Sequence, residues 1–277
     1  MTQYENFNQT QLRNAEGKLN KYLIPILSVI FIVLTFFVGA VIGYRLNYGY
    51  KDVRGPSMQS TINAEPYQDS KGYLWQDGVI FEYNATPAVG DIVIIRPDLS
   101  SAKTIIKRVI AFGGDKITIK KINDEYRVVV IRASGGGPQP LYEDYIKSYD
   151  DWSRSPSRSY NANGATIEYE SSFYSTYISG HVSGSQVDGR AGLSLVDDTI
   201  YYTIPKNHFF YLGDNRTNSS DARANGTANL DEIVGVVRVI VHDAYYAKKN
   251  GTLWWEIFKE SCAYFFRNIS EYFAWKG

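Results

Sequence analysis

The segment from Tyr22 to Tyr44 contains no charged residue and constrains the fold more than any other part of the chain. As a helix, its 23 residues would extend about 34 Å, enough to cross a bilayer core of about 30 Å. A cleavable secretory signal has a shorter apolar core, about 7–15 residues, and small residues follow it. Because this run is longer and ends in Gly-Tyr-Arg, we expect an uncleaved transmembrane anchor at 22–44, preceded by a polar tail at 1–21.

The region after the anchor consists of short β-branched runs separated by Pro, Gly, Asn and Asp, which favour turns. This pattern predicts a mainly β fold, an antiparallel β-rich domain formed by residues 45–131 and 201–250. With 277 residues, 44% of them hydrophobic, the chain can bury a sizeable core. The expected strands cover residues 79–83, 91–96, 104–111, 116–120, 126–131, 204–212 and 233–240.

Residues 132–200 are rich in Ser, Tyr, Gly and Asp and carry few aliphatic runs. We expect an inserted subdomain here, or a partly flexible excursion from the β domain, and we find no chemical motif in it.

The C-terminal part, residues 251–277, contains the one clear helical pattern, at 253–273. One face is predicted to carry Trp254, Ile257, Phe258, Cys262, Phe265, Ile269 and Tyr272. Such a stripe is typical of core packing, and it is equally typical of an amphipathic helix in a membrane interface.

The composition argues against several function classes. The formal net charge is zero, so charge gives no argument for nucleic-acid binding. A single cysteine, Cys262, excludes an intramolecular disulfide framework. The three histidines, His181, His208 and His242, are scattered and have no metal-ligand spacing, so we expect neither a metal nor a cofactor.

Ser57 is the candidate nucleophile, because it follows a Gly-Pro turn in the segment 54–62. A serine is a weak nucleophile at neutral pH and needs a nearby base. None of the histidines lies in a polar cluster between strands. Lys107 has apolar neighbours on both sides, and burial would lower the pKa of its amine toward neutrality. Taken alone, the position of Lys107 favours an ordinary lysine on a solvated strand face.

Four motifs in order then resemble the motif set of bacterial type I signal peptidases, the Ser/Lys dyad peptidase family. They are Gly-x-Ser-Met at 55–58, Gly-Asp-Ile-Val at 90–93 with Arg-Pro at 96–97, Lys-Arg-Val at 107–109 running to Gly-Gly-Asp at 113–115, and Gly-Asp-Asn-Arg at 213–216 followed by Asn218, Ser219, Asp221 and Arg223.

The resemblance implies a serine endopeptidase that removes signal peptides through an acyl-enzyme, with Ser57 as nucleophile and Lys107 as base. It implies that Ser219 hydrogen-bonds the Lys107 amine, and that Asp221 and Arg223 pair beside them. It also implies that the insertion at 132–200 is variable and lies well away from the chemistry.

Substrate contacts follow from the same resemblance. Met58 and Ile105 are expected to line shallow apolar pockets for small side chains such as Ala before the cut. The Ser57 backbone N–H is the expected oxyanion donor, because Gly55, two positions earlier, has no side chain to donate.

The basic residues on the two sides of the anchor do not decide its orientation. The family resemblance implies a single-pass cell-membrane protein with a cytoplasmic N-terminus and an extracytoplasmic catalytic domain. Residues 45–56 extend at most about 40 Å, so Ser57 would stay close to the membrane surface. The expected partners are preprotein signal peptides, the lipid bilayer and, as a candidate, the secretion translocon.

The chain departs from the family pattern near the nucleophile and in two later motifs. Pro56 directly precedes Ser57, Ser60 stands where the family usually has Pro, Thr217 replaces a more usual Asp, and Phe-Gly-Gly at 112–114 replaces a more usual Leu-Pro-Gly. We expect altered stiffness of the nucleophile loop and an altered substrate range.

Two other classes of protein stay open. An anchored accessory protein of the same fold, acting in surface-protein or pilus assembly, would keep the anchor and the sheet but lose the dyad. A soluble self-cleaving repressor would share the Ser/Lys chemistry but would have a DNA-binding N-terminus in place of the anchor.

Overall fold

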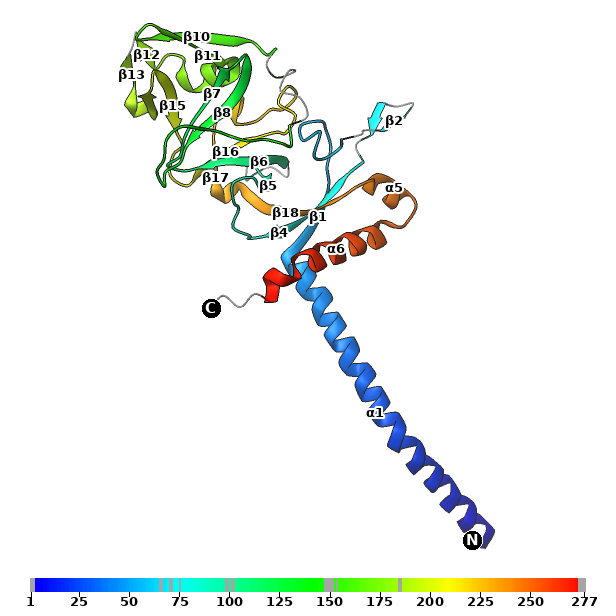
Figure 1. Ribbon diagram of the computed structural model, residues 1–277. Helices are drawn as coiled ribbons and strands as arrows, with labels where there is room; N and C mark the ends of the chain where they lie inside the picture. Colours follow the sequence, from blue (N-terminus) through cyan, green and yellow to red (C-terminus); the bar gives the residue numbers. More distant parts are fainter. Residues whose placement is uncertain are drawn as a thin grey trace. The chain divides into compact units, whose positions relative to one another are not determined.

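The computed structural model describes residues 3–64, 67–69, 72–74, 76–97, 100, 103–146, 152, 154–183 and 186–273. The chain forms two compact units, Met1–Tyr48 and Gly49–Gly277. The first contains a single long helix, and the second contains the β-sheets and the C-terminal helices (Figure 1).

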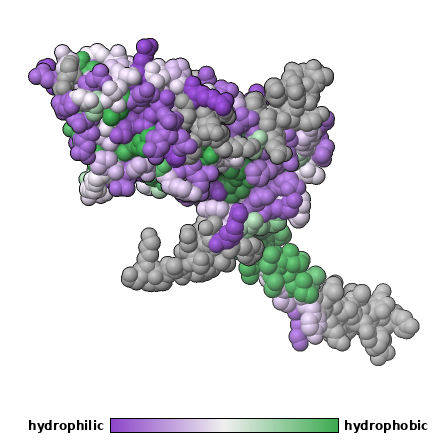
Figure 2. Space-filling model, turned by 45° about the horizontal axis from the view of Figure 1, so that its top comes forward, coloured by the Kyte–Doolittle hydropathy of each residue, from purple (hydrophilic) through white to green (hydrophobic). Residues whose placement is uncertain are grey.

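Helix α1 (Gln3–Asn47) includes the whole segment expected to be the anchor. Among the described residues, Lys21–Asn47 is long and apolar enough to cross a membrane. Figure 2 shows a band of hydrophobic residues on this helix, whereas the visible face of the β-rich unit is mostly hydrophilic. The helix also includes most of the segment 1–21 that was expected to be a separate tail. That segment has one glycine and no proline to end a helix, and its side chains before residue 21 lie outside the described part.

The first sheet has seven strands in the spatial order β1-β4-β18-β5-β6-β16-β17. The strand pairings described within it are antiparallel. The strands are β1 (Tyr48–Asp52), β4 (Gly78–Tyr83), β5 (Ile92–Ile95), β6 (Ile105–Phe112), β16 (His208–Leu212), β17 (Ala228–Asn229) and β18 (Ile233–Val241). The predicted mainly β, antiparallel fold is therefore confirmed. The strand expected at 204–212 starts only at His208, because Pro205 lacks an N–H and Asn207 has a φ of 63°.

The second sheet also has seven strands, in the order β10-β11-β7-β15-β14, with β8 joined to β7 and β9 joined to β8. Its strands are β7 (Lys116–Ile122), β8 (Glu125–Ile131), β9 (Gln139–Pro140), β10 (Ser157–Ala162), β11 (Ala165–Glu170), β14 (Leu193–Val196) and β15 (Thr199–Thr203). Two small hairpins complete the strands: β2 (Tyr67–Asp69) with β3 (Gly72–Leu74), and β12 (Val182–Ser183) with β13 (Gln186–Val187).

Short helical segments connect these strands. They are α3 (Ser171–Phe173), η1 (Tyr174–Ile178), η2 (Gly189–Ala191), α4 (Ala222–Asn225), η3 (Leu230–Glu232) and α5 (Ala244–Lys249).

The sheet boundary differs from the predicted start of the insertion at residue 132. Strands β7 and β8 belong to the second sheet, so this sheet begins at Lys116. Local sequence could not show this, because β7 and β8 have the same β-branched character as the strands before them. One buried hydrophobic cluster joins the two sheets and includes Val109 of β6, Ile117 of β7, Phe173 of α3 and Phe210 of β16. The insertion therefore shares a core with the first sheet.

The predicted C-terminal helix at 253–273 is present as α6 (Leu253–Phe273) and packs against β18. The described residues of the predicted apolar face are not all packed in the core, so core packing does not account for the whole face. Ile257 is 6% exposed and faces the protein, whereas Trp254 and Phe258 are 63% and 56% exposed. Successive residues on a helix differ by about 100°, so these exposed residues lie beside the buried stripe. The predicted positions Phe265, Ile269 and Tyr272 have side chains outside the described part.

The close packing of β18 on β4 can be tested at Gly235. A Cβ atom at this position would lie 2.5 Å from the backbone oxygen of Glu82, a contact that requires the backbone to shift. We expect Gly235→Ala to destabilise the folded protein by about 1–3 kcal/mol. Gly137→Ala is the matched control, because a Cβ there would meet nothing within 4 Å. Thermal melting followed by circular dichroism in detergent would measure both, and equal melting temperatures would contradict the prediction.

Candidate active site

Ser57 lies in a tight turn that follows β1. The turn is closed by backbone hydrogen bonds from Gln59 N to Pro56 O (2.9 Å) and from Ile62 N to Met58 O (2.8 Å). The Ser57 carbonyl accepts a hydrogen bond from Asn215 N at 3.1 Å, which ties the turn to the polar loop after β16. The Ser57 N–H, the expected oxyanion donor, donates to no described residue.

Lys107 is brought to Ser57 by β6, where it pairs with Val93 of β5. Its Nζ lies 2.9 Å from Ser57 Oγ and 2.9 Å from the carbonyl oxygen of Ile106. Lys107 is 3% exposed, and this burial lowers the pKa of its amine from 10.5 to about 8, although the charges of Asp221 and Asp214 act in the opposite direction. The structure thus brings together the two residues expected to form the dyad, and it excludes the solvated alternative for Lys107.

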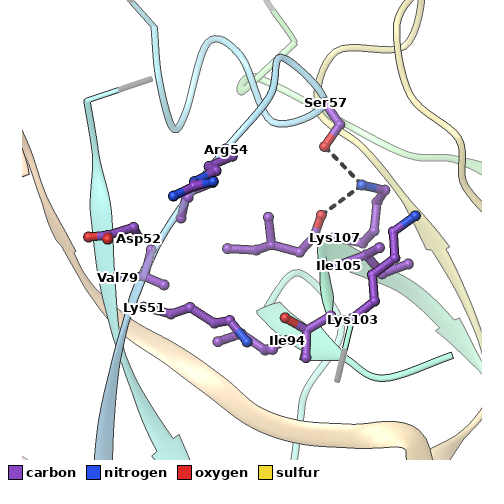
Figure 3. Close-up of a pocket in the computed structure, with 12 residues that line it drawn as sticks. Lys51, Asp52, Arg54, Ser57, Val79, Ile94, Lys103, Ile105 and Lys107 are labelled. Atoms are coloured by element: carbon purple, nitrogen blue, oxygen red, sulfur yellow. Dashed lines mark hydrogen bonds between the residues drawn. The ribbon is translucent and has the colours of Figure 1, made fainter. Parts of the chain in front are cut away.

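A cavity of about 580 Å³ opens beside these two residues. Figure 3 shows the Ser57 hydroxyl and the Lys107 amine pointing toward each other at its edge. Its apolar wall comes from β4, β5, β6 and the segment before Ser57, and Lys51, Arg54 and Lys103 add three cationic side chains. The described lining residues are Lys51, Asp52, Val53, Arg54, Ser57, Val79, Ile94, Lys103, Thr104, Ile105, Ile106 and Lys107.

The two predicted substrate contacts differ in position. Ile105 lines the cavity, as expected from the sequence. Met58 does not line it, because the turn directs this side chain into a buried cluster with Val53, Val79 and Ile94, where it is 1% exposed. Since those three residues do line the cavity, Met58 supports the wall from behind.

Ser219 does not make the hydrogen bond to Lys107 that was expected. Its Oγ is buried and has no hydrogen-bond partner among the described residues. It lies at the close approach of the nucleophile turn and the polar loop: a Cβ at Gly213 would be 2.2 Å from Ser219 Oγ and 2.4 Å from Ser57 O. The Lys107 amine is held instead by Ser57 and by the Ile106 carbonyl.

Asp221 and Arg223 form the expected pair. Arg223 Nε and Nη2 donate to the two carboxylate oxygens of Asp221 at 2.9 and 3.0 Å. Asp221 also accepts from Gly213 N at 3.1 Å, and its backbone begins helix α4. The buried carboxylate therefore fixes the polar loop at both of its ends.

A second ion pair, in which Asp214 is buried and the Arg108 side chain is 12% exposed, joins the turn to the sheet and was not predicted. Arg108 donates to both oxygens of Asp214, at 2.9 and 2.6 Å, and Thr61 Oγ1 donates to the same carboxylate at 2.5 Å. Arg108 and Asp214 both belong to the motifs that carry the family resemblance, so the sequence did mark these two positions. Bidentate geometry of this kind fixes direction as well as distance.

The insertion contacts the nucleophile turn, contrary to the expectation that it lies well away from the chemistry. Ser60 Oγ donates to the Tyr145 carbonyl at 2.5 Å, and the Arg108 guanidinium lies 3.9 Å from the centre of the Tyr145 ring. Glu143 pairs with Arg216 of the polar loop, and both side chains are 1% exposed. The local sequence around Glu143 gave no signal of this long-range contact.

Asn63 is a further positioning residue that sequence reasoning missed. Its Nδ2 donates to the carbonyls of Val53 and Gly55, at 3.2 and 3.3 Å, and it exchanges two hydrogen bonds with Asp77. Asn63 is 2% exposed and has a φ of 58°, which Asn tolerates better than most residues. It therefore fixes the chain immediately before the nucleophile.

Comparison with known families gives the family of the chain. The family model described as signal peptidase, peptidase S26, matches residues 21–242, most of the chain. The chain belongs to this signal peptidase family. Helices α5 and α6 lie after the last matched residue.

The similar curated proteins are signal peptidases I. One from Aquifex aeolicus is 28% identical over 59% of this chain and 64% of its own length. Signal peptidase I U of Bacillus subtilis is 24% identical over 79% of this chain and 87% of its own length, and the enzyme of Rickettsia typhi is 29% identical over 61% and 55%. The matches thus span less than two thirds of the Aquifex and Rickettsia proteins.

Among solved structures, a signal peptidase I from Enterococcus faecalis is similar to this chain. It is 22% identical, and the similarity covers 55% of this chain and 97% of that chain with a TM-score of 0.29. At this TM-score the similarity adds nothing to the family assignment.

Ser60 stands where the family usually has Pro, and its backbone conformation leads to a testable prediction. Its φ of 85° lies in the left-handed region, whereas proline is fixed near −65°. We expect Ser60→Pro to displace the nucleophile turn and to lower the kcat of peptide cleavage at least about tenfold, because misplacing reacting groups by about 1 Å can cost 100-fold. Ser60→Gly, which accepts positive φ, should keep most of the activity. Equal kcat values for the two variants would contradict the prediction.

Proposed function

We propose that this protein is a membrane-anchored serine endopeptidase that removes N-terminal signal peptides from exported preproteins. The observation that carries the proposal is the 2.9 Å approach of the buried Lys107 amine to the Ser57 hydroxyl, beside a cavity. Membership of the signal peptidase family supports the substrate class. The apolar segment Lys21–Asn47 supports the anchor. Membership of the family supports the proposed orientation, with the N-terminus in the cytoplasm and the β-rich unit on the other side.

In the proposed mechanism, neutral Lys107 accepts the hydroxyl proton of Ser57 while Ser57 Oγ attacks the carbonyl carbon of the scissile amide. The hydrogen bond to the Ile106 carbonyl occupies one N–H of the amine and leaves its lone pair available to accept the Ser57 proton. Lys107 then gives the proton to the leaving nitrogen, and the amide C–N bond breaks to leave an acyl-enzyme.

Deacylation reverses these roles for a water molecule. Lys107 takes a proton from the water, the resulting hydroxide attacks the ester carbonyl, and Ser57 recovers its proton as the ester bond breaks. The Ser57 N–H is our candidate donor to the oxyanion in both steps.

The cavity supports recognition of small side chains before the cut. Ile105 and the other apolar lining residues form its wall, and small apolar pockets exclude bulky groups by steric contact. The polar loop would act through the turn: Asp221, Arg223, Asp214 and Ser219 position the dyad rather than contact the substrate.

The dyad is tested by cleavage of a preprotein with an Ala-x-Ala site, using the purified full chain in detergent. We expect Ser57→Ala and Lys107→Ala each to lower the rate at least about 100-fold, because each removes an essential group. Ser159→Ala and Lys121→Ala, which alter residues of the second sheet, are matched controls that should retain full activity. No cleavage by the unmodified chain, with several substrates and at pH values up to about 9, would favour the anchored accessory protein instead.

The pH dependence of kcat/KM tests Lys107 as the base. The neutral amine is the reactive form, so activity should be low below the pKa of about 8 and rise about tenfold per pH unit toward it. It should level off once the amine is neutral. A profile that is flat between pH 6 and pH 9, or that falls across this range, would contradict the assignment of the base.

A further inference from the structure

Helix α6 packs on the first sheet through one of its faces, and helix α5 is hydrogen-bonded to the segment before β4. Ile257 on this face is buried, and α6 packs on β18. Tyr245 N of α5 donates to Gln76 O at 2.8 Å, and Ala247 of the same helix is 8% exposed. These contacts fix which side of α6 turns outward.

The outward side of α6 carries large aromatic residues. Trp254, Trp255 and Phe258 are 63%, 59% and 56% exposed, and the rings of Trp255 and Phe258 stack with centroids 5.7 Å apart. Scattered apolar residues on a surface are ordinary, but adjacent exposed tryptophan and phenylalanine side chains indicate an interaction surface. We call these three residues the aromatic face of α6.

The aromatic face lies within reach of the membrane to which the anchor would bind. Lys248 Nζ of α5 lies 3.2 Å from Asp52 Oδ2, at the end of β1. Strand β1 starts directly after α1, and its five residues extend at most about 17 Å. The end of α5 is therefore attached to β1, the strand that directly follows the apolar span in the sequence.

The residue types favour a lipid surface over a protein partner. Tryptophan is enriched at the boundary between headgroups and acyl chains, and lysine beside it interacts with anionic headgroups. Residues 244–273, which include both helices, contain four basic and three acidic side chains, and Lys249 and Arg267 are exposed. On α6, Lys259 pairs with Glu256 at 2.7 Å and lies four residues, about 40°, from Trp255, so this lysine stands at the edge of the aromatic face.

We propose that the aromatic face of α6 lies in the interface of an anionic bilayer and forms a second membrane contact, in addition to the α1 span. This contact would hold the β-rich unit against the membrane through a part of the chain that lies outside the residues matched by the family model. The inference rests on the proposed anchoring by α1.

The experiment uses the full chain in nanodiscs of phosphatidylethanolamine and phosphatidylglycerol. Cys262 is the single cysteine, so Cys262→Ser gives a background for spin labels at Trp255→Cys, Phe258→Cys or Ala263→Cys. Ala263 is exposed and lies about 80° from Trp255 and about 140° from Phe258, on the polar side, so it is the matched control on the same helix. Collision rates of each label with oxygen, which concentrates in lipid, and with a water-soluble nickel chelate would be measured, after circular dichroism has shown unchanged melting.

The measured quantity is the ratio of the collision rate with oxygen to the collision rate with the chelate. We expect this ratio to be at least about threefold higher for labels at 255 and 258 than for the label at 263, because side chains in the membrane interface are near lipid and away from water. Equal ratios at the three sites, with high chelate access, would overturn the proposal. Protection of 255 and 258 from both reagents would also overturn it, because that result indicates a protein partner.

Flotation of the full chain with vesicles tests α1 separately. A chain that fails to float contradicts the anchor, whereas a floating chain with labels 255 and 258 in water contradicts only the second contact.

Discussion

The burial of one lysine amine against one serine hydroxyl is the interaction on which the rest of the site depends. Removing water from Lys107 favours its neutral form, while the negative charges of Asp221 and Asp214 favour the ammonium form. Burial dominates, so the pKa falls to about 8. A more acidic surrounding would keep the amine protonated, and a more open one would keep it solvated. Each of the two nearby carboxylates is also paired with an arginine, whose positive charge opposes the effect of the carboxylate on the amine.

Those arginine pairs explain how an acidic loop can lie beside the dyad. Arg223 and Arg108 neutralise Asp221 and Asp214 through two hydrogen bonds each. Removing one partner of such a buried pair typically costs about 3–5 kcal/mol, since a charge is then left without compensation. The pairs also orient the backbone around the nucleophile, because Asp221 binds Gly213 N and Asp214 binds Thr61. Electrostatic balance and loop geometry thus come from the same side chains.

The features that the sequence predicted well are those set by local pattern. Strands β4 to β8 coincide within a few residues with β-branched runs bounded by turn residues, and α6 follows helical periodicity, so neighbouring positions suffice to find them. The nearness of Ser57 and Lys107 and the Asp221–Arg223 pair were expected from motif order. The contacts that were missed join distant segments: Ser60 to Tyr145 and Glu143 to Arg216. The contact that was wrongly expected, Ser219 to Lys107, would also have joined distant segments, whereas Lys107 donates to the carbonyl of its own neighbour Ile106. Met58 was misassigned because the turn, whose path local sequence does not determine, directs it inward.

The continuous hydrophobic cluster beneath the two sheets has a consequence for how this chain can change. Phe173 from the insertion touches Phe210 of the first sheet, with ring centroids 6.3 Å apart, and Tyr177 donates to the carbonyl of Ala222 beside the polar loop. An insertion joined only by a linker could be lengthened, lost or exchanged between relatives as a cassette. Here the same exchange would remove part of the folding unit that carries the nucleophile. The two sheets therefore form one folding unit rather than two separable ones.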